Sequence, residues 1–434
     1  MQRTKVAIVG MGTVGSGVAR LLLDHGDRTA RHAGRVLWLE KAVVRDLRKP
    51  RTADLPAGVL TDDLQQVLRD PEIKVAAHLV GGLEPARTIM LELLHAGKDI
   101  VTANKALLAQ HGAELFDVAR KLGRSIAFEA SVAGGVPIIT NISQCLSANQ
   151  ILSLEGILNG TSNFIVTQME NQGMAYDQAV RLAQENGYAE ADPTMDVDGS
   201  DAAQKLAILA HLAFGARAHW EDIPRIGIDQ LDPLDLQFAR HLGYRIKLLA
   251  SAHLGNTGLE LHVAPTLVRA GTPLAEVQDA FNAIRVIGDA VGPVFFHGLG
   301  AGQMPTASAV VADLIDTAVG RCKLTFQTLE LFSLVNPPRV HLRDADDMPG
   351  RYYLRMHVDD TPGVLAKVTG ALGRHAVSIA SVIQHEPDQH AGKRSVPLVV
   401  MTHEASEGAA SAAAEEIQTF AQTHGKLIRL RVKA

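Results

Sequence analysis

Four aspartates and one lysine stand close together in "ADPTMDVDGSDAAQKLAILA", residues 191–210. Acidic residues favour helix N-termini, where free backbone N–H groups and the helix dipole stabilise negative charge, so Asp198 or Ser200 could cap the helix that the apolar run predicts. Capping does not explain Asp201 and Lys205, which share one helix face because they are four residues apart. An acid–lysine pair at the edge of a core is either a structural ion pair or part of a catalytic site, and the spacing leaves both readings open.

The composition indicates a chain with ordinary apolar cores. Its 434 residues suggest about three domains, and 47% of the residues are hydrophobic. The net charge of -5 and the lack of a basic stripe argue against a nucleic-acid partner. Cys145 and Cys322 have no metal-ligand spacing and fit the reducing cytoplasm, where we expect the protein. We expect no signal peptide and no membrane span, because the N-terminus has no h-region and no run of about twenty apolar residues occurs.

Residues 5–25, "KVAIVGMGTVGSGVARLLLDH", place a glycine-rich turn between a short apolar strand and an amphipathic helix. This strand–turn–helix context is the one that a dinucleotide-binding fingerprint requires. Gly10 permits the tight turn, Gly12 lets the backbone approach a pyrophosphate, and Gly15 allows close packing of helix and strand. The pyrophosphate would then face the N-terminus of the helix.

The second strand, predicted over residues 36–44, is followed by basic residues. An NAD site usually has an acid at this strand end to hold the ribose hydroxyls, but Arg45 comes first here and Asp46 second. Arg45, with Lys49 and Arg51 just beyond it, suits the 2′-phosphate of NADP. A solvated surface arginine is an equally good reading, so the sequence leans toward NADP and leaves NAD open.

Strands and helices continue to alternate up to about residue 135, which predicts a mostly parallel sheet with helices on both faces. The pattern includes a strand and glycine turn over 125–135. Ligands in such sheets lie beyond the carboxyl ends of strands, and Lys105 follows one of these ends. We therefore expect Lys105 to reach the nicotinamide region of the cofactor. A later glycine loop with Gly300 and Gly302 opens a long helix, and it could contact the cofactor from the opposite side.

The C-terminal residues 352–434 follow a strand–helix–strand–strand–helix–strand order, with one helix starting after Pro362–Gly363 and another near 407–423. A charged stretch with two adjacent prolines, residues 337–350, resembles a linker before this segment. The residues between the two ends mix strands and helices, so we expect a separate middle domain.

Six stretches together resemble homoserine dehydrogenases of the monofunctional type with a C-terminal ACT domain. They are "GMGTVGSGV", "VTANKALLA", "EASVAGGVPII", "EGILNGTSNFI", "GYAEADPTMDVDGSDAAQKLAILA" and "GAGQMPTASAVVADL". The resemblance covers nearly the whole chain. It implies an α/β fold with a Rossmann-type doubly wound parallel sheet at 1–137, an α+β substrate and dimerisation domain at 138–336, a linker at 337–351 and a ferredoxin-like βαββαβ ACT domain at 352–434.

The resemblance also implies the NAD(P)-dependent interconversion of L-homoserine and L-aspartate 4-semialdehyde, on the route to threonine, methionine and isoleucine. Lys205 matches the lysine that moves the proton, Lys105 a second lysine near the nicotinamide, Glu190 the residue that holds the substrate amino group, and Asp201 an acid that supports substrate and lysine. Thr13, Val14, Arg45 and Lys105 match cofactor contacts of the family. Together with Gly10, Gly12 and Gly15 of the glycine-rich turn and Gly302 of the later loop, they are the candidate cofactor-binding residues. A sodium site formed mainly by backbone carbonyls matches Glu129, Val132, Gly134 and Val136. Threonine feedback through the ACT domain and a homodimer or homotetramer are also implied.

General chemistry is compatible with these roles. Oxidising an alcohol requires removal of the hydroxyl proton, and a lysine with a lowered pKa can accept it. Two lysines near one oxygen would lower each other's pKa, whereas Asp201 would act in the opposite direction. A rival aldehyde dehydrogenase would need an activated cysteine, but Cys145 has no histidine nearby in the sequence. A non-catalytic sensor is a second rival, but it would not need a paired lysine and acid.

Overall fold

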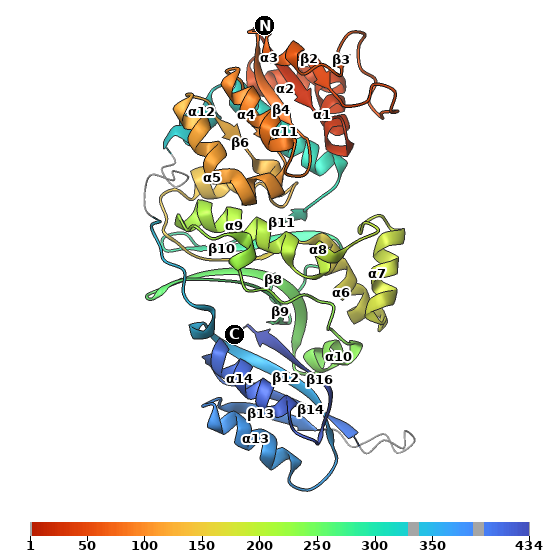
Figure 1. Cartoon of the computed structure of the whole chain (residues 1–434), viewed down its shortest axis with the longest axis vertical. Helices are drawn as coiled ribbons and strands as arrows, with labels where there is room; N and C mark the ends of the chain where they lie inside the picture. Colours follow the sequence, from red (N-terminus) through yellow and green to blue (C-terminus); the bar gives the residue numbers. More distant parts are fainter. Residues whose placement is uncertain (1, 329–337, 385–394, 434) are drawn as a thin grey trace. The chain divides into compact units, whose positions relative to one another are not determined.

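The computed structural model describes residues 2–328, 338–384 and 395–433 (Figure 1). The chain divides into two compact units. Unit 1 comprises Met1–Leu154, Ala203–Ile223 and Phe281–Val340, and unit 2 comprises Glu155–Ala202, Pro224–Ala280 and His341–Ala434. Strand β7 (Ile151–Ile157) and helix α9 (Ser200–Phe214) each have residues in both units.

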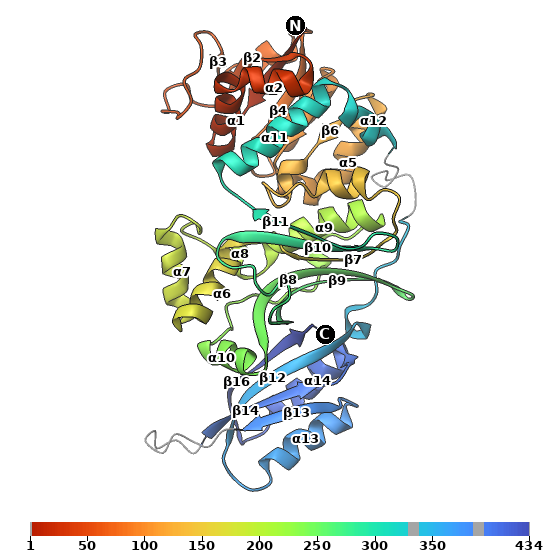
Figure 2. The ribbon, with the colours of Figure 1, turned by 180° about the vertical axis from the view of Figure 1, so that it is seen from behind.

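Unit 1 contains a six-stranded parallel sheet of order β3-β2-β1-β4-β5-β6 within the described residues. Strand β1 is buried along most of its length, as expected for a strand with helices on both faces of its sheet (Figures 1 and 2). The strand order reverses between β1 and β4, which is where doubly wound sheets bind ligands. The strands are β1 (Arg3–Val9), β2 (Val36–Val43), β3 (Leu60–Thr61), β4 (Ile73–His78), β5 (Asp99–Thr102) and β6 (Ile126–Ala127).

One helix of this unit comes from far along the chain. Helix α11 (Gln303–Ala318) packs beside α1 (Thr13–Asp24), and a Cβ on Gly17 would stand 2.9 Å from the Cβ of Ala307. The two helices can approach this closely because Gly17 has no side chain. The other elements are α2 (Gly26–Ala33), α3 (Gln65–Leu68), α4 (Ala86–His95), α5 (Lys105–Lys121), α12 (Arg321–Thr328), short turns at Glu129–Ser131, Asn141–Cys145 and Trp220–Asp222, and the hairpin of β10 (Phe281–Gly288) and β11 (Gly292–Leu299).

Unit 2 contains strands in the order β8-β9-β16-β12-β14-β13. The long antiparallel pair of β8 and β9 meets β16 in parallel, so the C-terminal strands extend the same sheet. The C-terminal segment has the expected βαββαβ order. The elements are α6 (Gly160–Gln172), α7 (Tyr176–Glu185), α8 (Thr194–Val197), α10 (Pro233–His241), β8 (Tyr244–Gly255), β9 (Gly258–Arg269), β12 (Pro349–Asp359), α13 (Val364–Arg374), β13 (Ile379–Gln384), β14 (Ser395–Thr402), β15 (Ala405–Ser406), α14 (Glu407–Gln418) and β16 (Thr423–Val432).

The structure confirms the α/β class and differs from the expectations at element ends. The strand expected within 125–135 is only two residues long, because the backbone turns at Glu129 to bring its carboxylate to two N–H groups. The helix expected near 407–423 ends at Gln418, whose side chain binds Gly425 and Leu427 instead. Strand β12 begins inside the expected linker, and the first linker residue lies outside the described residues.

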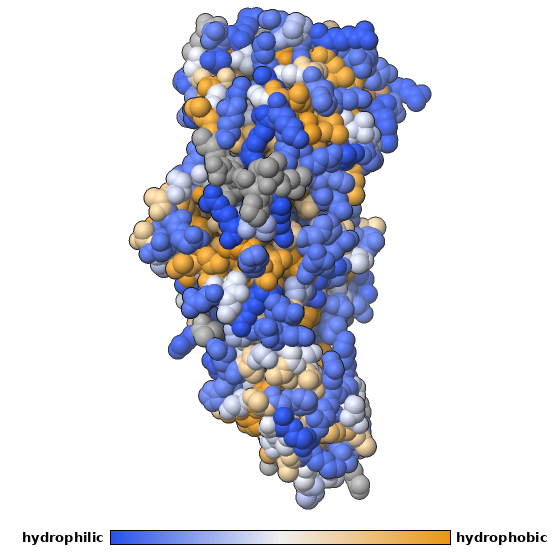
Figure 3. Space-filling model, turned by 60° about the vertical axis from the view of Figure 1, so that its left-hand side comes forward, coloured by the Kyte–Doolittle hydropathy of each residue, from blue (hydrophilic) through white to orange (hydrophobic). Residues whose placement is uncertain are grey.

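Apolar side chains remain exposed at a few places on the described surface. One face is mostly hydrophilic, with separate apolar patches between polar residues (Figure 3). The rings of Phe281 and Phe295 lie beside His297 on the β10–β11 hairpin, with ring centroids 5.1 and 6.4 Å from that of the histidine. All three side chains are exposed. Within the described ranges, we find no helix of the length and apolarity needed to cross a membrane.

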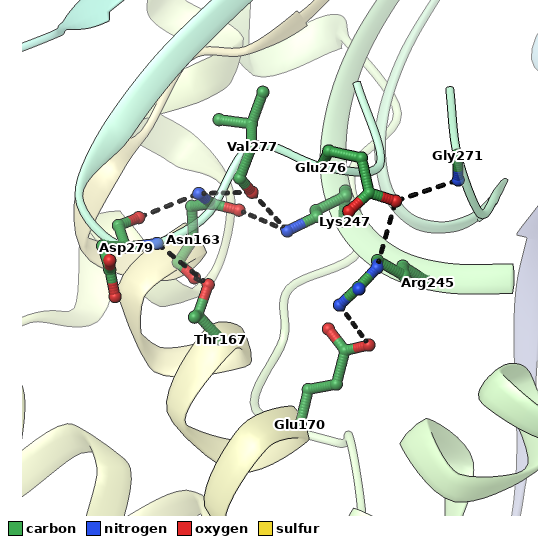
Figure 4. A network of polar contacts seen from close by, with 9 residues as sticks. All are labelled: Asn163, Thr167, Glu170, Arg245, Lys247, Gly271, Glu276, Val277 and Asp279. Carbon is green, nitrogen blue, oxygen red and sulfur yellow. Dashed lines mark hydrogen bonds and ion pairs between the residues drawn. The ribbon is translucent and has the colours of Figure 1, made fainter. Parts of the chain in front are cut away.

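A buried lysine holds helix α6 in unit 2. Lys247 on β8 is fully buried, and its ammonium group donates to the Asn163 side chain at 3.3 Å and to the Val277 carbonyl (Figure 4). The Asn163 amide donates to the Asp279 carbonyl at 2.8 Å, and the Asp279 N–H donates to Thr167 at 3.1 Å. Burial lowers the pKa of Lys247 to about 8. These bonds fix α6 against β8 and the 277–279 backbone.

Replacing Lys247 by methionine should change how stability depends on pH. Between pH 8 and the ordinary lysine value of 10.5, the unfolded chain binds the proton and the folded chain has lost it, so wild-type stability rises with pH in this window. The difference in unfolding free energy between wild type and Lys247→Met should therefore grow by up to roughly 3 kcal/mol across the window and stay constant below pH 7. Urea unfolding at several pH values measures it. Lys121→Met, at an exposed position, is the control, and a pH-independent difference for Lys247→Met would contradict the prediction.

Candidate active site

The glycine turn after β1 is tightly packed at two positions and open at one. Gly10 has a φ of 104°, and a Cβ there would stand 2.7 Å from the Leu79 carbonyl oxygen. A Cβ on Gly15 would stand 2.1 Å from the Gly10 carbonyl oxygen. A Cβ on Gly12 would meet nothing within 4 Å. Gly10 and Gly15 are therefore required by the fold, whereas Gly12 borders open space, where a ligand can approach the backbone.

A cavity of about 590 Å³ lies at the carboxyl ends of β1, β2 and β4. Its lining includes Gly10, Gly12 and Arg45, together with Val80 and Gly81 after β4. Thr13 and Val14 form the first turn of α1 directly after Gly12. A cavity beside a helix N-terminus at this switch point has the position and the N–H donors that a pyrophosphate needs.

The basic residues after β2 have different surroundings. Arg45 and Lys49 are exposed on the cavity lining. Arg51 donates to the carbonyls of Lys49 at 2.7 Å and Asp46, so it organises its own loop. The Asp46 carboxylate accepts from the Arg48 backbone N–H at 2.9 Å. Arg45 and Lys49 are therefore better placed than Arg51 to bind a phosphate.

Lys105 is the first residue of helix α5, and Asn104 sets its position. The Asn104 side chain accepts from the Leu107 N–H at 3.0 Å, which caps the helix. Its amide donates to the carbonyls of Val80 at 2.9 Å and Gly82 at 2.7 Å. Val80 lines the cavity, so this buried amide joins the start of α5 to the cavity rim.

The acid-rich stretch separates into two acids at helix starts and a buried cluster. The Asp192 carboxylate accepts from the Thr194 N–H at 3.1 Å at the start of α8, and the Thr194 hydrogen bonds lower the pKa of Asp192. The Asp198 carboxylate accepts from the Ser200 N–H at 2.7 Å and hydroxyl at 2.9 Å at the start of α9. Capping thus explains Asp198, as the sequence indicated, whereas Asp192 binds the first residue of α8 without capping that helix. Glu190 is exposed.

Asp196 and Asp201 meet at a residue that the sequence analysis did not identify. The side-chain amide of Asn159 donates to Asp196 at 2.7 Å and to Asp201 at 2.8 Å. Its carbonyl oxygen accepts from the Ser162 N–H and caps α6. Asp201 is 4% exposed, and Lys205, one turn further along α9, is 9% exposed. The described hydrogen bonds of Asn159 reach these two aspartates and not Glu190.

The loop 132–136 packs directly against the backbone at Gly300. Ala133 and Gly134 have positive φ values of 52° and 31°, and a Cβ on Gly134 would stand 2.6 Å from the Gly300 carbonyl oxygen. The Glu129 carboxylate accepts from the N–H groups of Ile139 and Thr140, both at 2.8 Å. Val132 and Val136 are buried. Any cation in this loop would therefore be bound mainly by carbonyl oxygens, which suits a hard cation.

Glu129 also meets a buried acid. Its N–H donates to Asp313 on α11 at 2.9 Å. Burial raises the pKa of Asp313 well above its usual range, and the nearby Glu129 charge adds to this rise. Within the described ranges, no group of three or more histidine, cysteine, aspartate or glutamate residues is arranged to hold a metal ion.

The glycine loop before α11 lies beside the β1–α1 turn. Gly302 has a φ of 118° and precedes the helix, and the next residue, Gln303, donates from its side chain to the Thr13 carbonyl at 3.0 Å. Gln303 was missed by the sequence analysis, and only its place directly after Gly302 pointed to it. The residue after Gly302 thus contacts the β1–α1 turn, and the contact of Gly302 with the cofactor stays a prediction.

Comparison with known proteins assigns the whole chain. Residues 137–315 match the family model "Homoserine dehydrogenase", residues 10–129 match "Homoserine dehydrogenase, NAD binding domain", and residues 352–421 match "ACT domain". The homoserine dehydrogenase of Synechocystis is 42% identical over 421 residues, covering 95% of each chain. That of Pseudomonas aeruginosa is 40% identical and covers 100% of this chain and 99% of its own.

Solved structures agree with this assignment. The crystal structure of a homoserine dehydrogenase from Thiobacillus denitrificans superposes with a TM-score of 0.92 at 40% identity, covering 100% of this chain and 99% of its own. A hyperthermophilic archaeal homoserine dehydrogenase in complex with NADPH superposes with a TM-score of 0.62 at 25% identity, covering 73% of this chain and 98% of its own. With its NAD-binding, catalytic and ACT regions all matched, the chain belongs to the homoserine dehydrogenase family of oxidoreductases.

Proposed function

We propose that the protein interconverts L-homoserine and L-aspartate 4-semialdehyde with NADP as its preferred cofactor, in the biosynthesis of threonine, methionine and isoleucine. The observation that carries this proposal is the start of α9, where Asp201 is buried against the Asn159 amide and Lys205 follows one turn later. A carboxylate and a lysine on one helix face can bind an amino acid and move a proton.

In this proposal, Glu190 and Asp201 bind the substrate ammonium group. Lys205 takes the hydroxyl proton as homoserine is oxidised, and returns it in the reverse direction. Lys105 acts near the nicotinamide end and stabilises the developing negative charge on the reacting oxygen. The support is its position at the start of α5, directly after the capping residue Asn104. The nicotinamide supplies the hydride chemistry, and the protein binds, orients and polarises the substrate.

The cofactor lies on the glycine turn and along the cavity after β1, β2 and β4. The pyrophosphate binds to the turn formed by Gly10, Gly12, Thr13, Val14 and Gly15. The open space beside Gly12 supports this. Arg45 binds the 2′-phosphate, because it is exposed on the cavity lining. Gly302 contacts the cofactor from the side of α11.

A monovalent cation, sodium, binds to the loop formed by Glu129, Val132, Gly134 and Val136. Two observations support this. Ala133 and Gly134 have positive φ values, and two N–H groups already occupy the Glu129 carboxylate. Backbone carbonyl oxygens are therefore the main ligands left for the cation. This cation would order the loop on the 299–300 backbone, which Gly135 contacts at 3.0 Å.

Further proposals concern regulation and assembly. Threonine, the end product, acts as an effector at the ACT domain. The chain works in the cytoplasm as a homodimer or homotetramer, and the exposed rings of Phe281, Phe295 and His297 support a subunit interface on the β10–β11 hairpin. We expect these roles to be divided among three domains, at 1–137, 138–336 and 352–434.

Purified protein should reduce NADP or NAD when L-homoserine is added, and Lys205→Met should lower kcat by about 100-fold or more, because general acid–base catalysis contributes at least this much. Absorbance of the reduced nicotinamide measures both. Lys121→Met at an exposed site on α5 should keep wild-type kcat. Near-normal turnover by folded Lys205→Met would remove the role given to Lys205, and no turnover by wild type in either direction would favour a sensor.

Two glycine variants should separate cofactor binding from folding. Gly12→Ala adds a methyl group to open space, so its thermal midpoint should stay near wild type while its Kd for NADP rises about 10-fold or more, because the pyrophosphate cannot approach. Gly15→Ala places a methyl group against the Gly10 carbonyl, so it should unfold at lower temperature. Thermal melts and NADP titrations test both, and an unchanged Kd in Gly12→Ala would move the pyrophosphate elsewhere.

The Arg45→Gln variant should discriminate between the two cofactors. A charge-assisted hydrogen bond contributes about 1.5–3 kcal/mol, so KM for NADP should rise roughly 10- to 100-fold while KM for NAD stays the same. Arg48→Gln is the matched control, since Arg48 is exposed and pairs with Asp46. Equal changes in KM for NADP and for NAD would show that Arg45 does not bind the 2′-phosphate.

A further inference from the structure

A buried ion pair joins helix α10 to the ACT region inside unit 2. Asp235 on α10 is 0% exposed, and its carboxylate accepts from the Arg355 guanidinium through Nε and, at 2.9 Å, through a terminal nitrogen. The hydroxyl of Tyr353 donates to the same carboxylate at 3.1 Å. Arg355 and Tyr353 lie on β12, the first strand of the ACT region. One carboxylate thus receives three donors from that strand.

The carboxylate of Asp235 also belongs to the cap of its own helix. It accepts from the Asp232 N–H at 3.0 Å, and the Asp232 carboxylate accepts from the Leu234 N–H at 2.8 Å. A shift of β12 would therefore act on the first turn of α10, and on the segment just before it. That segment, residues 224–231, is called the α10 approach below.

Backbone hydrogen bonds form a second connection, between the ACT region and β9. Strand β16 pairs in parallel with β9, with Arg431 opposite Thr266 and Val432 opposite Leu267. The Lys433 N–H donates to the Leu267 carbonyl at 2.9 Å, and its side chain forms an ion pair with Glu155. The ACT sheet is therefore attached to β9 as well as to α10.

The α10 approach contacts β9 on one side and the acid-rich stretch on the other. The Ile226 N–H donates to the Val263 carbonyl of β9 at 2.9 Å, and the Ile228 N–H donates to the Val197 carbonyl at 2.8 Å. At Gly227, a Cβ would stand 2.4 Å from the Val197 carbonyl oxygen and 2.8 Å from the Cα of Asp198. At Gly227 and Ile228 the approach therefore lies directly against the backbone of residues 197–198.

Asp198 then sets the start of helix α9. Its carboxylate holds the Ser200 N–H and hydroxyl. Asp201 is the next residue, and Lys205 lies one turn beyond it. Direct contacts thus run from β12 through α10 and its approach to the helix end that carries the proposed substrate acid.

We propose that Asp235 and Arg355 are positioning residues that couple the ACT region to the substrate acid at the start of α9. With the pair formed, the α10 approach holds Asp198 and Asp201 in place for the ammonium group of the substrate. An amino acid bound at the ACT region changes substrate affinity by shifting β12 and thereby this pair. The identity of the substrate and of the effector rests on the proposed function; the coupling rests on the contacts.

A buried ion pair suits such a role. Removing one partner leaves an uncompensated buried charge, whereas replacing both by apolar residues of similar size is often neutral for stability. The paired carboxylate and guanidinium can be satisfied in only one relative position of β12 and α10, because both are planar and directional. The pair therefore specifies how the two elements are placed more than it stabilises them.

The test compares Arg355→Met with Arg429→Met in the full-length protein. Arg429 forms an ion pair with Glu407 within the ACT region, so its loss disturbs that region without touching α10. Arg355→Met should raise KM for L-homoserine about 5-fold or more with kcat nearly unchanged, and should weaken hydrogen-exchange protection of residues 224–231 and 196–203. Arg429→Met should keep the wild-type KM and protection in both segments. L-threonine should change the KM of wild type and of Arg429→Met, but not of Arg355→Met.

Folding and the proposed function are checked separately. If Arg355→Met does not fold, the double variant Asp235→Leu with Arg355→Met, which leaves no unpaired charge, should fold and show the same KM rise and loss of protection. A folded variant with wild-type KM and wild-type protection at 196–203 would overturn the coupling, as would equal changes in Arg429→Met. If wild type does not oxidise L-homoserine, the proposed function fails, and the exchange data alone still decide the coupling. If wild type oxidises L-homoserine but ignores L-threonine, threonine is not the effector, and KM and exchange still decide the coupling.

Discussion

The burial of the Asp201 carboxylate is the constraint on which the arrangement of the candidate site depends. This side chain is 4% exposed, and removing a carboxylate from water without a partner costs several kcal/mol. The Asn159 amide is a partner of this carboxylate at 2.8 Å, and it can donate this bond only if the first turns of α6 and α9 lie together. The same amide holds Asp196, so the end of α8 is placed by the same contact.

Helix α6 keeps this position through polar contacts along one face. Asn159, Asn163 and Thr167 are spaced four residues apart, so they form a stripe on a helix whose middle residues are buried. Asn163 and Thr167 bind Lys247 and the Asp279 backbone, which apolar side chains could not do with the same directionality. The network of Figure 4 and the carboxylate cluster are therefore two ends of one stripe.

Features that depend on neighbours in the chain could be predicted from the sequence, and features that depend on distant neighbours could not. The glycine turn, the capping role of Asp198 and the C-terminal βαββαβ order follow from local conformational preferences and periodicity. The packing of Gly17 against Ala307 and the bond of Gln303 to Thr13 join residues about 290 positions apart, and periodicity says nothing of such pairs. The strand expected within 125–135 was too long because the Glu129 carboxylate turns the backbone toward Ile139 and Thr140. The stripe on α6 was not identified from the sequence, and only the structure shows that Asn159 reaches Asp201.

Charged groups of the ACT region form two kinds of ion pair, one partly buried within the region and one fully buried at its boundary with α10. Glu407 pairs with Arg429 and Arg431 and receives the Tyr352 hydroxyl at 2.9 Å, with both guanidinium groups near the Tyr352 ring, so these charges are satisfied within one packed module. Asp235 and Arg355 satisfy each other only across the boundary between α10 and β12. Apolar contacts at such a boundary would tolerate small shifts at little cost, because the hydrophobic effect is non-directional. A buried, directional pair does not tolerate them, so a displacement of β12 must either break the pair or move α10. The backbone pairing of β16 with β9 favours the second outcome, since it keeps the ACT strands in the same sheet as β9 while α10 and its approach move.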